Sequence, residues 1–121
     1  RSDMRDVYAG RNEGDEKCKR AFDVFAHHVK KYIGAYSAIM NGCDILVMTG
    51  GIGENAWFMR EHILTNMEFL GVEVDFDLNK TIMGEDKIIS TPNSRIATMV
   101  VTTDEEFVIA SDTDRLVNGC K

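Results

Sequence analysis

The sequence has one proline, three cysteines and no long apolar segment. The cysteines Cys18, Cys43 and Cys120 form no C-x-x-C pair, which argues against a disulfide framework and against a zinc site. No uncharged apolar run approaches the length of a membrane span, and the N-terminal RSDMRD lacks the apolar core of a signal peptide. These absences predict a cytoplasmic protein in a reducing compartment, with no membrane partner.

Positive charge is also scarce. The 121 residues carry a formal net charge of -6, and the largest basic run is a pair such as Lys30–Lys31. This balance argues against a nucleic-acid or anionic-membrane surface. It does not exclude a phosphate ligand, because backbone N–H groups and one arginine can bind phosphate locally. The chain is 44% hydrophobic, and its composition and length predict a single α/β domain over residues 1–121.

Apolar periodicity predicts two helices with a strand between them. In residues 15–41 apolar side chains recur every three or four positions, which predicts a long helix that stops at Asn41–Gly42. The run DILVMT (44–49) predicts a strand buried on both faces, and therefore parallel to its neighbour. A second helix is expected over residues 56–70, with Gly71 closing it.

The rest of the chain reads as shorter elements. We expect a short helix or turn at 2–14, a strand at 72–75, a loop with a helical turn at 77–86, strands at 87–91 and 96–101, and a last helix from Thr103. The alternation of helices and strands predicts the α/β class, with a largely parallel sheet flanked by helices.

Three glycines separate the expected strand at 44–49 from the helix that follows it. Gly50, Gly51 and Gly53 stand in the segment VMTGGIGENA, and Asn55 is expected to cap the following helix. Glycines let the backbone approach a ligand, and a helix N-terminus attracts phosphate. One glycine would suffice for a tight turn with close packing, so three favour a ligand-binding loop.

The residues alone leave the ligand of this loop open. GIGENA (51–56) fits the dinucleotide pattern G-x-G-x-x-A, with Asp75 near the end of the next strand as the ribose partner. The long helix before the strand fits that pattern poorly. The phosphate-binding motif G-x-x-x-x-G-K-[ST] is absent, which excludes a Walker-type site.

Segments distributed over nearly the whole chain resemble the C-terminal part of the acetate/propionate kinase family. They are SDMRD (2–6), AFDVFAHHVKKYIGAYSAIM (21–40), TGGIGEN (49–55), FLGVEVD (69–75) and TTDEEFVIASDT (102–113). The resemblance implies the actin-like, sugar-kinase-like ATPase fold, in which two α/β halves clamp ATP. It also implies that the chain is a C-terminal fragment of such a kinase.

The resemblance further implies roles for individual residues. The implied ATP contacts are Asp3, Met4 and Arg5 in the first motif and Gly51, Ile52, Gly53, Glu54 and Asn55 in the second, and the implied magnesium-associated carboxylate is Glu105. Arg5 has a planar guanidinium that can stack on adenine or pair with phosphate. Glu105 would also be favoured simply as an acid in a first helical turn.

The resemblance implies an intact enzyme that transfers a phosphoryl group between ATP and acetate, giving acetyl phosphate and ADP. It implies Mg²⁺, a small carboxylate substrate and a homodimer. The family's catalytic arginine, aspartate and histidine match no residue of this chain, so the chain alone is expected to be inactive. The alternatives are a propionate or butyrate kinase, a dinucleotide-binding oxidoreductase domain, and a non-catalytic nucleotide-binding or dimerisation module.

Overall fold

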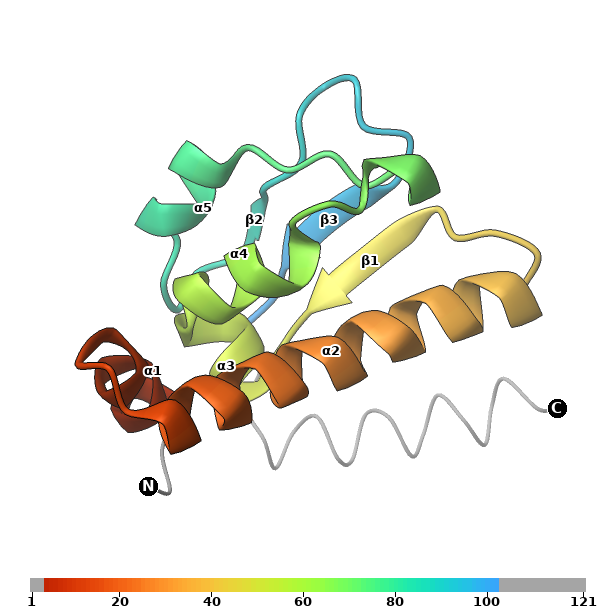
Figure 1. The fold of residues 1–121 in the computed structure, drawn as a ribbon. Coiled ribbons are helices and arrows are strands. Elements are labelled where there is room, and N and C mark those ends of the chain that lie inside the picture. Colours follow the sequence, from red (N-terminus) through yellow and green to blue (C-terminus); the bar gives the residue numbers. More distant parts are fainter. Residues whose placement is uncertain (1–3, 103–121) are drawn as a thin grey trace, which may run out of the picture.

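The computed structural model describes residues 4–102 (Figure 1). Within this range the elements are α1 (Met4–Asn12), α2 (Glu16–Ile39), β1 (Ile45–Met48), α3 (Gly50–Asn55), α4 (Trp57–Leu64), the 3-10 helix η1 (Glu68–Leu70), α5 (Phe76–Thr81), β2 (Lys87–Ile88) and β3 (Ala97–Val100). The expected helix from Thr103 lies outside the described residues, as do Asp3 and Glu105.

The described strands form one sheet in the order β1-β3-β2. β1 is parallel to β3, in register from Ile45 opposite Ala97, and β2 is antiparallel to β3. The α/β class is therefore confirmed, but within residues 4–102 the sheet is mixed rather than largely parallel. The reason is the short connection between β2 and β3, which can only reverse the chain, whereas a parallel pair needs a long crossover. The expected strand at 72–75 contributes two isolated bridges, Val72 to Ile96 and Val74 to Ser90.

The long helix α2 forms where the periodicity predicts it. Its first turn is capped by Asp15, whose carboxylate accepts hydrogen bonds from the amides of Lys17 at 2.9 Å and Cys18 at 3.2 Å. It stops at the predicted place, because Asn41 and Gly42 take positive φ angles of 59° and 125°. Figure 1 shows that the chain then returns along β1, beside α2 and in the opposite direction.

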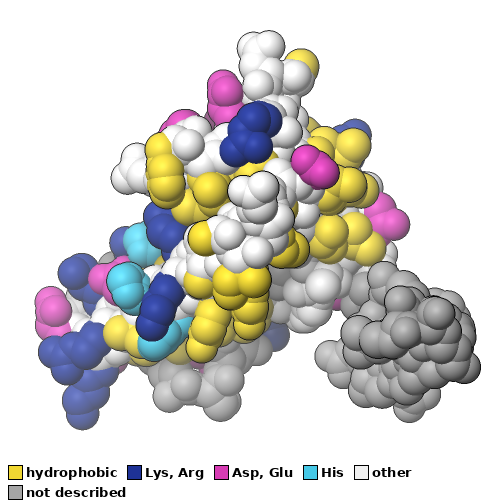
Figure 2. All heavy atoms as spheres, turned by 90° about the vertical axis from the view of Figure 1, so that its right-hand side faces the viewer, with side chains coloured by type: hydrophobic (Ala, Val, Ile, Leu, Met, Phe, Trp, Pro, Cys, Tyr) yellow, Lys and Arg dark blue, Asp and Glu magenta, His cyan; other side chains and the backbone are white. Residues whose placement is uncertain are grey.

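β1 is parallel as expected, but it is not buried on both faces. Ile45 and Val47 are 57% and 47% exposed, whereas Met48 is buried. This alternation is that of a strand with one covered face among the described residues. Tyr36 and Ile39 on α2 are exposed as well. Figure 2 looks toward the end of α2 and the start of β1, and it shows apolar side chains gathered on this side.

The second predicted helix is interrupted. α4 ends at Leu64, and Asn66 takes a positive φ of 61° before η1 begins. Asparagine tolerates this left-handed conformation, which breaks the helix without breaking the apolar stripe. Met67 beyond the break is still buried, and Gly71 closes η1 with a φ of 105°, as expected.

An aromatic cluster holds α1 against the rest of the fold. The ring of Tyr8 stacks on Phe58 with centroids 4.0 Å apart, and it lies 5.6 Å from Phe22 and 6.2 Å from Trp57. Aromatic pairs at these separations stabilise packing beyond the area that they bury. The cluster fixes α1 relative to α2 and α4, and with it the position of Arg5.

Candidate functional site

An open pocket of about 570 Å³ lies between α1, α3 and the segment that follows α5. Its lining residues are Met4, Arg5, Gly51, Ile52, Asn55, Ala56 and Met83. Residues from both predicted nucleotide motifs are among them. Tertiary structure therefore brings Met4 and Arg5 of the first motif close to the second motif, which is far away in the sequence.

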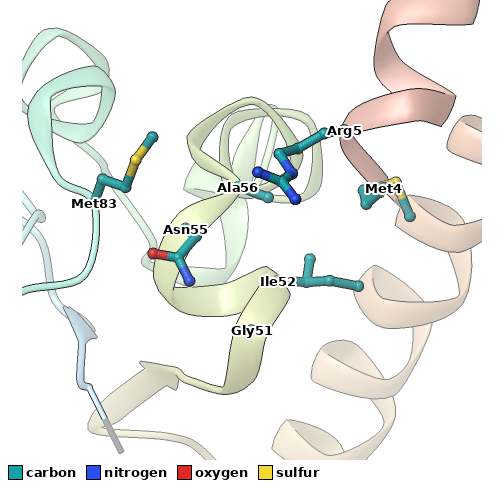
Figure 3. Close-up of a pocket in the computed structure, with 7 residues that line it drawn as sticks. All are labelled: Met4, Arg5, Gly51, Ile52, Asn55, Ala56 and Met83. Carbon is teal, nitrogen blue, oxygen red and sulfur yellow. The ribbon is translucent and has the colours of Figure 1, made fainter.

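The pocket combines polar groups with apolar walls. Figure 3 shows the guanidinium of Arg5 pointing from α1 toward α3, with the Asn55 amide reaching into the same space. Ile52 extends toward Met4, and Met83 stands across the pocket on the other side. Small-molecule sites typically occupy about 300–1,000 Å³, with apolar walls and few polar groups. The arrangement can hold a flat apolar ring beside hydroxyl or phosphate groups.

The glycines Gly50, Gly51 and Gly53 of the segment VMTGGIGENA each have a different physical role. Gly50 has a positive φ of 80°, which disfavours other residues. A Cβ on Gly53 would lie 2.9 Å from the carbonyl carbon of Met48, so Gly53 allows α3 to pack against the end of β1. A Cβ on Gly51 would meet no atom within 4 Å, and Gly51 lines the pocket. The Cβ position of Gly50 is equally open, but of the three glycines Gly51 alone lines the pocket, where a ligand can approach the backbone.

Asn55 is not the N-cap of the following helix, contrary to the sequence prediction. It is the last residue of α3, a helix that begins at Gly50. The residue before α3 is Thr49, whose hydroxyl donates to the carbonyl of Val101 at 2.9 Å rather than capping the helix. Glycines disfavour helices, so a contact outside the motif has to stabilise this one.

That contact comes from Arg60 on α4, a residue that the sequence analysis missed. Its side chain is fully buried, and burial lowers its pKa, although arginine stays protonated in proteins. It donates to the carbonyls of Gly53 and Glu54, both at 3.0 Å, at the C-terminal end of α3. A cation there favours the helix. The available sequence signal was the spacing of four from Ala56, which places Arg60 on the buried face of α4.

Gly53 and Glu54 do not line the pocket, although the resemblance implied that they contact ATP. Gly53 is buried against Met48. The main-chain carbonyl of Glu54 also accepts a hydrogen bond from the amide of Gly84 at 3.1 Å. Their observed contacts shape α3 and attach it to its neighbours.

Asp75, the acid of the dinucleotide pattern, has a local structural role. It is the N-cap of α5, and its carboxylate accepts a hydrogen bond from the amide of Leu78 at 3.0 Å. It is not among the residues that line the pocket. The geometry therefore favours a ligand site formed by the DMR and GIGEN motifs over one formed by the dinucleotide pattern with Asp75.

The described residues contain no group of three side chains suited to hold a metal ion. Glu105, the implied magnesium-associated carboxylate, lies outside them, and so does Asp3. No helix within residues 4–102 is long and apolar enough to cross a membrane. Cys18 and Cys43 form no disulfide bond with each other.

Solved structures share this fold. The crystal structure of Porphyromonas gingivalis acetate kinase matches with a TM-score of 0.84 and 42% identity, covering 96% of this chain and 29% of that chain. A propionate kinase from Francisella tularensis matches with a TM-score of 0.76 and 39% identity, covering 89% of this chain and 27% of that chain. The protein is thus an α/β protein of the actin-like, sugar-kinase-like class.

The family follows from the sequence comparisons. The model of the acetokinase family matches residues 1–111. The acetate kinase of Parabacteroides distasonis is 48% identical over 112 residues, which are 93% of this chain and 28% of that protein. The chain belongs to the acetokinase family, as the resemblance indicated. It spans less than a third of the length of these relatives.

Proposed function

We propose that this chain forms the ATP-binding wall of an acetate kinase. In the full-length protein, a phosphoryl group passes reversibly between ATP and acetate, giving acetyl phosphate and ADP. The single observation that carries this proposal is the convergence of Met4 and Arg5 with Gly51, Ile52 and Asn55 in one pocket. The acetate kinase relatives support the choice of reaction.

Each lining residue has a role in the proposed complex. Ile52 and Met83 offer apolar surface to the base, and Gly51 lets the backbone approach the nucleoside. The Asn55 amide hydrogen-bonds the ribose or the base. Arg5 stacks on the base or pairs with phosphate through its planar fork. Such a site works by positioning and by charge stabilisation, as in other phosphoryl transfers.

The remaining assignments rest on the family resemblance. Asp3 completes the first motif, and Glu105 is the proposed magnesium-associated carboxylate, because one carboxylate with waters commonly holds Mg²⁺. When bound, Mg²⁺ supplies neutralisation of phosphate charge. The full-length protein is proposed to be a homodimer in the cytoplasm, and sedimentation of the purified protein tests the dimer.

Propionate is the alternative acyl substrate, because a propionate kinase is among the matching structures. The residues that line the pocket lie on the proposed nucleotide side and do not distinguish acetate from propionate. Steady-state kinetics of the full-length protein with acetate, propionate and butyrate resolves the substrate. The largest kcat/KM identifies it.

The nucleotide assignment is tested with Arg5→Ala and Asp75→Asn in the full-length protein, titrated calorimetrically with ATP and with NAD. A lost hydrogen bond to a charged group costs about 1.5–3 kcal/mol, so Arg5→Ala should weaken ATP binding about tenfold or more. Asp75→Asn should be silent, because asparagine also caps helices well. A silent Arg5→Ala with NAD binding lost in Asp75→Asn would instead establish the dinucleotide alternative.

The reaction itself is tested by trapping acetyl phosphate as a hydroxamate. The full-length protein should turn over with ATP, Mg²⁺ and acetate, and residues 1–121 alone should not, because they carry one wall of the site. Turnover of the isolated chain at about 1–100 per second, a usual kinase rate, would contradict the proposal that residues 1–121 carry only one wall of the active site. ATP binding without turnover in the full-length protein would favour the non-catalytic alternative.

A further inference from the structure

Arg60 connects the ends of two helices that flank the pocket. At α3 its Nη1 donates to the carbonyls of Gly53 and Glu54, both at 3.0 Å. At α5 its Nη2 donates to the carbonyls of Asn79 at 2.9 Å and Ile82 at 2.6 Å, and its Nε donates to the Asn79 side-chain oxygen at 2.7 Å. One buried cation thus lies at the negative ends of both helices.

Met83 stands between two residues that are attached to this assembly. Before it, the carbonyl of Ile82 accepts the hydrogen bond from Arg60. After it, the amide of Gly84 donates to the carbonyl of Glu54 at 3.1 Å. The side chain of Met83 is itself 62% exposed and lines the pocket opposite Arg5 (Figure 3). Its main chain is held at both ends while its side chain is free to meet a ligand.

We propose that Arg60 is a positioning residue for nucleotide binding, which sets the spacing between the Asn55 wall and the Met83 wall of the pocket. The inference rests on the proposed function, because it assumes that the pocket takes the nucleoside of ATP. The effect needs arginine in particular. Its rigid fork donates to four carbonyls in two directions, whereas a lysine ammonium has three donors on a single nitrogen.

The experiment measures kcat, the KM for ATP and the KM for acetate in the full-length protein and in three variants. Arg60→Lys keeps the positive charge and removes the planar guanidinium. Met83→Ala removes the side chain whose position Arg60 is proposed to set. Arg95→Lys is the matched control, because Arg95 is an exposed arginine that also donates to a main-chain carbonyl, that of Leu70, away from the pocket. A thermal melt of each variant accompanies the kinetics.

Arg60→Lys and Met83→Ala should each raise the KM for ATP about fivefold or more, the equivalent of about one hydrogen bond. The KM for acetate should not change, and kcat should stay within about twofold, the split expected when only nucleotide binding is affected. Arg95→Lys should match the wild type. In the double variant the two KM effects should not add, because Arg60 acts through the wall that Met83 provides.

Unchanged KM values in Met83→Ala, or full additivity in the double variant, would overturn the inference. If Arg60→Lys does not fold, Asn79→Ala replaces it and should also raise the KM for ATP without changing the KM for acetate. It removes the Nε partner of Arg60 together with the hydrogen bond from the Asn79 side chain to the carbonyl of Trp57, and leaves the four main-chain acceptors of Arg60 in place. Met83→Ala alters an exposed side chain, so the test does not depend on either buried variant. Failure of the proposed function is distinguishable, because Arg5→Ala would then leave the KM for ATP unchanged in an otherwise intact background.

Discussion

Replacing Gly53 by alanine should destabilise the protein without acting on the ligand. The new Cβ would lie 2.9 Å from the carbonyl carbon of Met48, 3.5 Å from its Cα and 3.6 Å from its carbonyl oxygen. These are main-chain atoms at the end of β1, so they cannot move aside as a flexible side chain could. Overpacking of this kind costs about 1–3 kcal/mol.

Gly51→Ala is the matched control for this substitution. Both glycines lie in α3, and alanine is favoured over glycine in a helix by about 0.8–1.0 kcal/mol in either case. A Cβ on Gly51 meets no atom within 4 Å. Because the helix preference is common to both variants, their difference in stability isolates the contact with Met48. We expect Gly53→Ala to be less stable than Gly51→Ala by about 1–3 kcal/mol.

Urea unfolding measures the difference. With a slope of about 2 kcal/mol/M, a difference of about 2 kcal/mol separates the two midpoints by about 1 M. ATP affinity should fall more in Gly51→Ala than in Gly53→Ala, because Gly51 lines the pocket and Gly53 does not. Equal midpoints for the two variants would refute the packing role of Gly53. A loss of ATP affinity confined to Gly53→Ala would indicate that Gly53 contacts the ligand, as the motif alone suggested.

Two further predictions follow from contacts outside α3. The carboxylate of Asp86 accepts hydrogen bonds from the amide of Thr102 at 2.6 Å and from its hydroxyl at 2.8 Å, which lowers the pKa of Asp86. The contribution of this carboxylate to stability should be fully present above the unfolded-state pKa of about 3.9, and it should be lost as the pH falls through the lowered folded-state pKa. Asp86→Asn should therefore destabilise the protein in thermal melts at pH 7, and its difference from the wild type should shrink as the pH falls below about 3.9. Tyr8→Ala should remove the stack on Phe58 that holds α1, which should lower the free energy of unfolding in urea by about 2–4 kcal/mol. It should also weaken ATP binding, because α1 carries Arg5. Unchanged ATP affinity in a folded Tyr8→Ala variant would show that the position of α1 does not affect ATP binding.

Part of the fold was predictable from local pattern. The apolar period of three to four and the Asn41–Gly42 stop predicted α2, because both are properties of a single segment. The continuous apolar run predicted β1 and its parallel direction, but it did not predict that β3 is the partner strand. Its exposure was not predictable, because burial depends on which other elements cover the strand.

The motifs predicted much of the candidate pocket. DMR and GIGEN identified Met4, Arg5, Gly51, Ile52 and Asn55, all of which line it. The motifs alone did not show which of their residues line the pocket and which of them support α3. Gly53 and Glu54 are not among the residues that line the pocket, and both their main-chain carbonyls accept hydrogen bonds from Arg60.

The family, the α/β class and the two motifs could be identified from local sequence, since these depend on the identity and spacing of neighbouring residues. Tertiary structure decided that the glycine-rich segment is a helix, with Asn55 at its end. Glycine opposes that helix locally, and the buried guanidinium of Arg60 stabilises it from a different helix. Tertiary structure also decided that Met83 forms a wall of the pocket. Arg60 reaches two chain segments at once through donors in a fixed plane, and no local pattern in the sequence records which carbonyls a buried cation will meet.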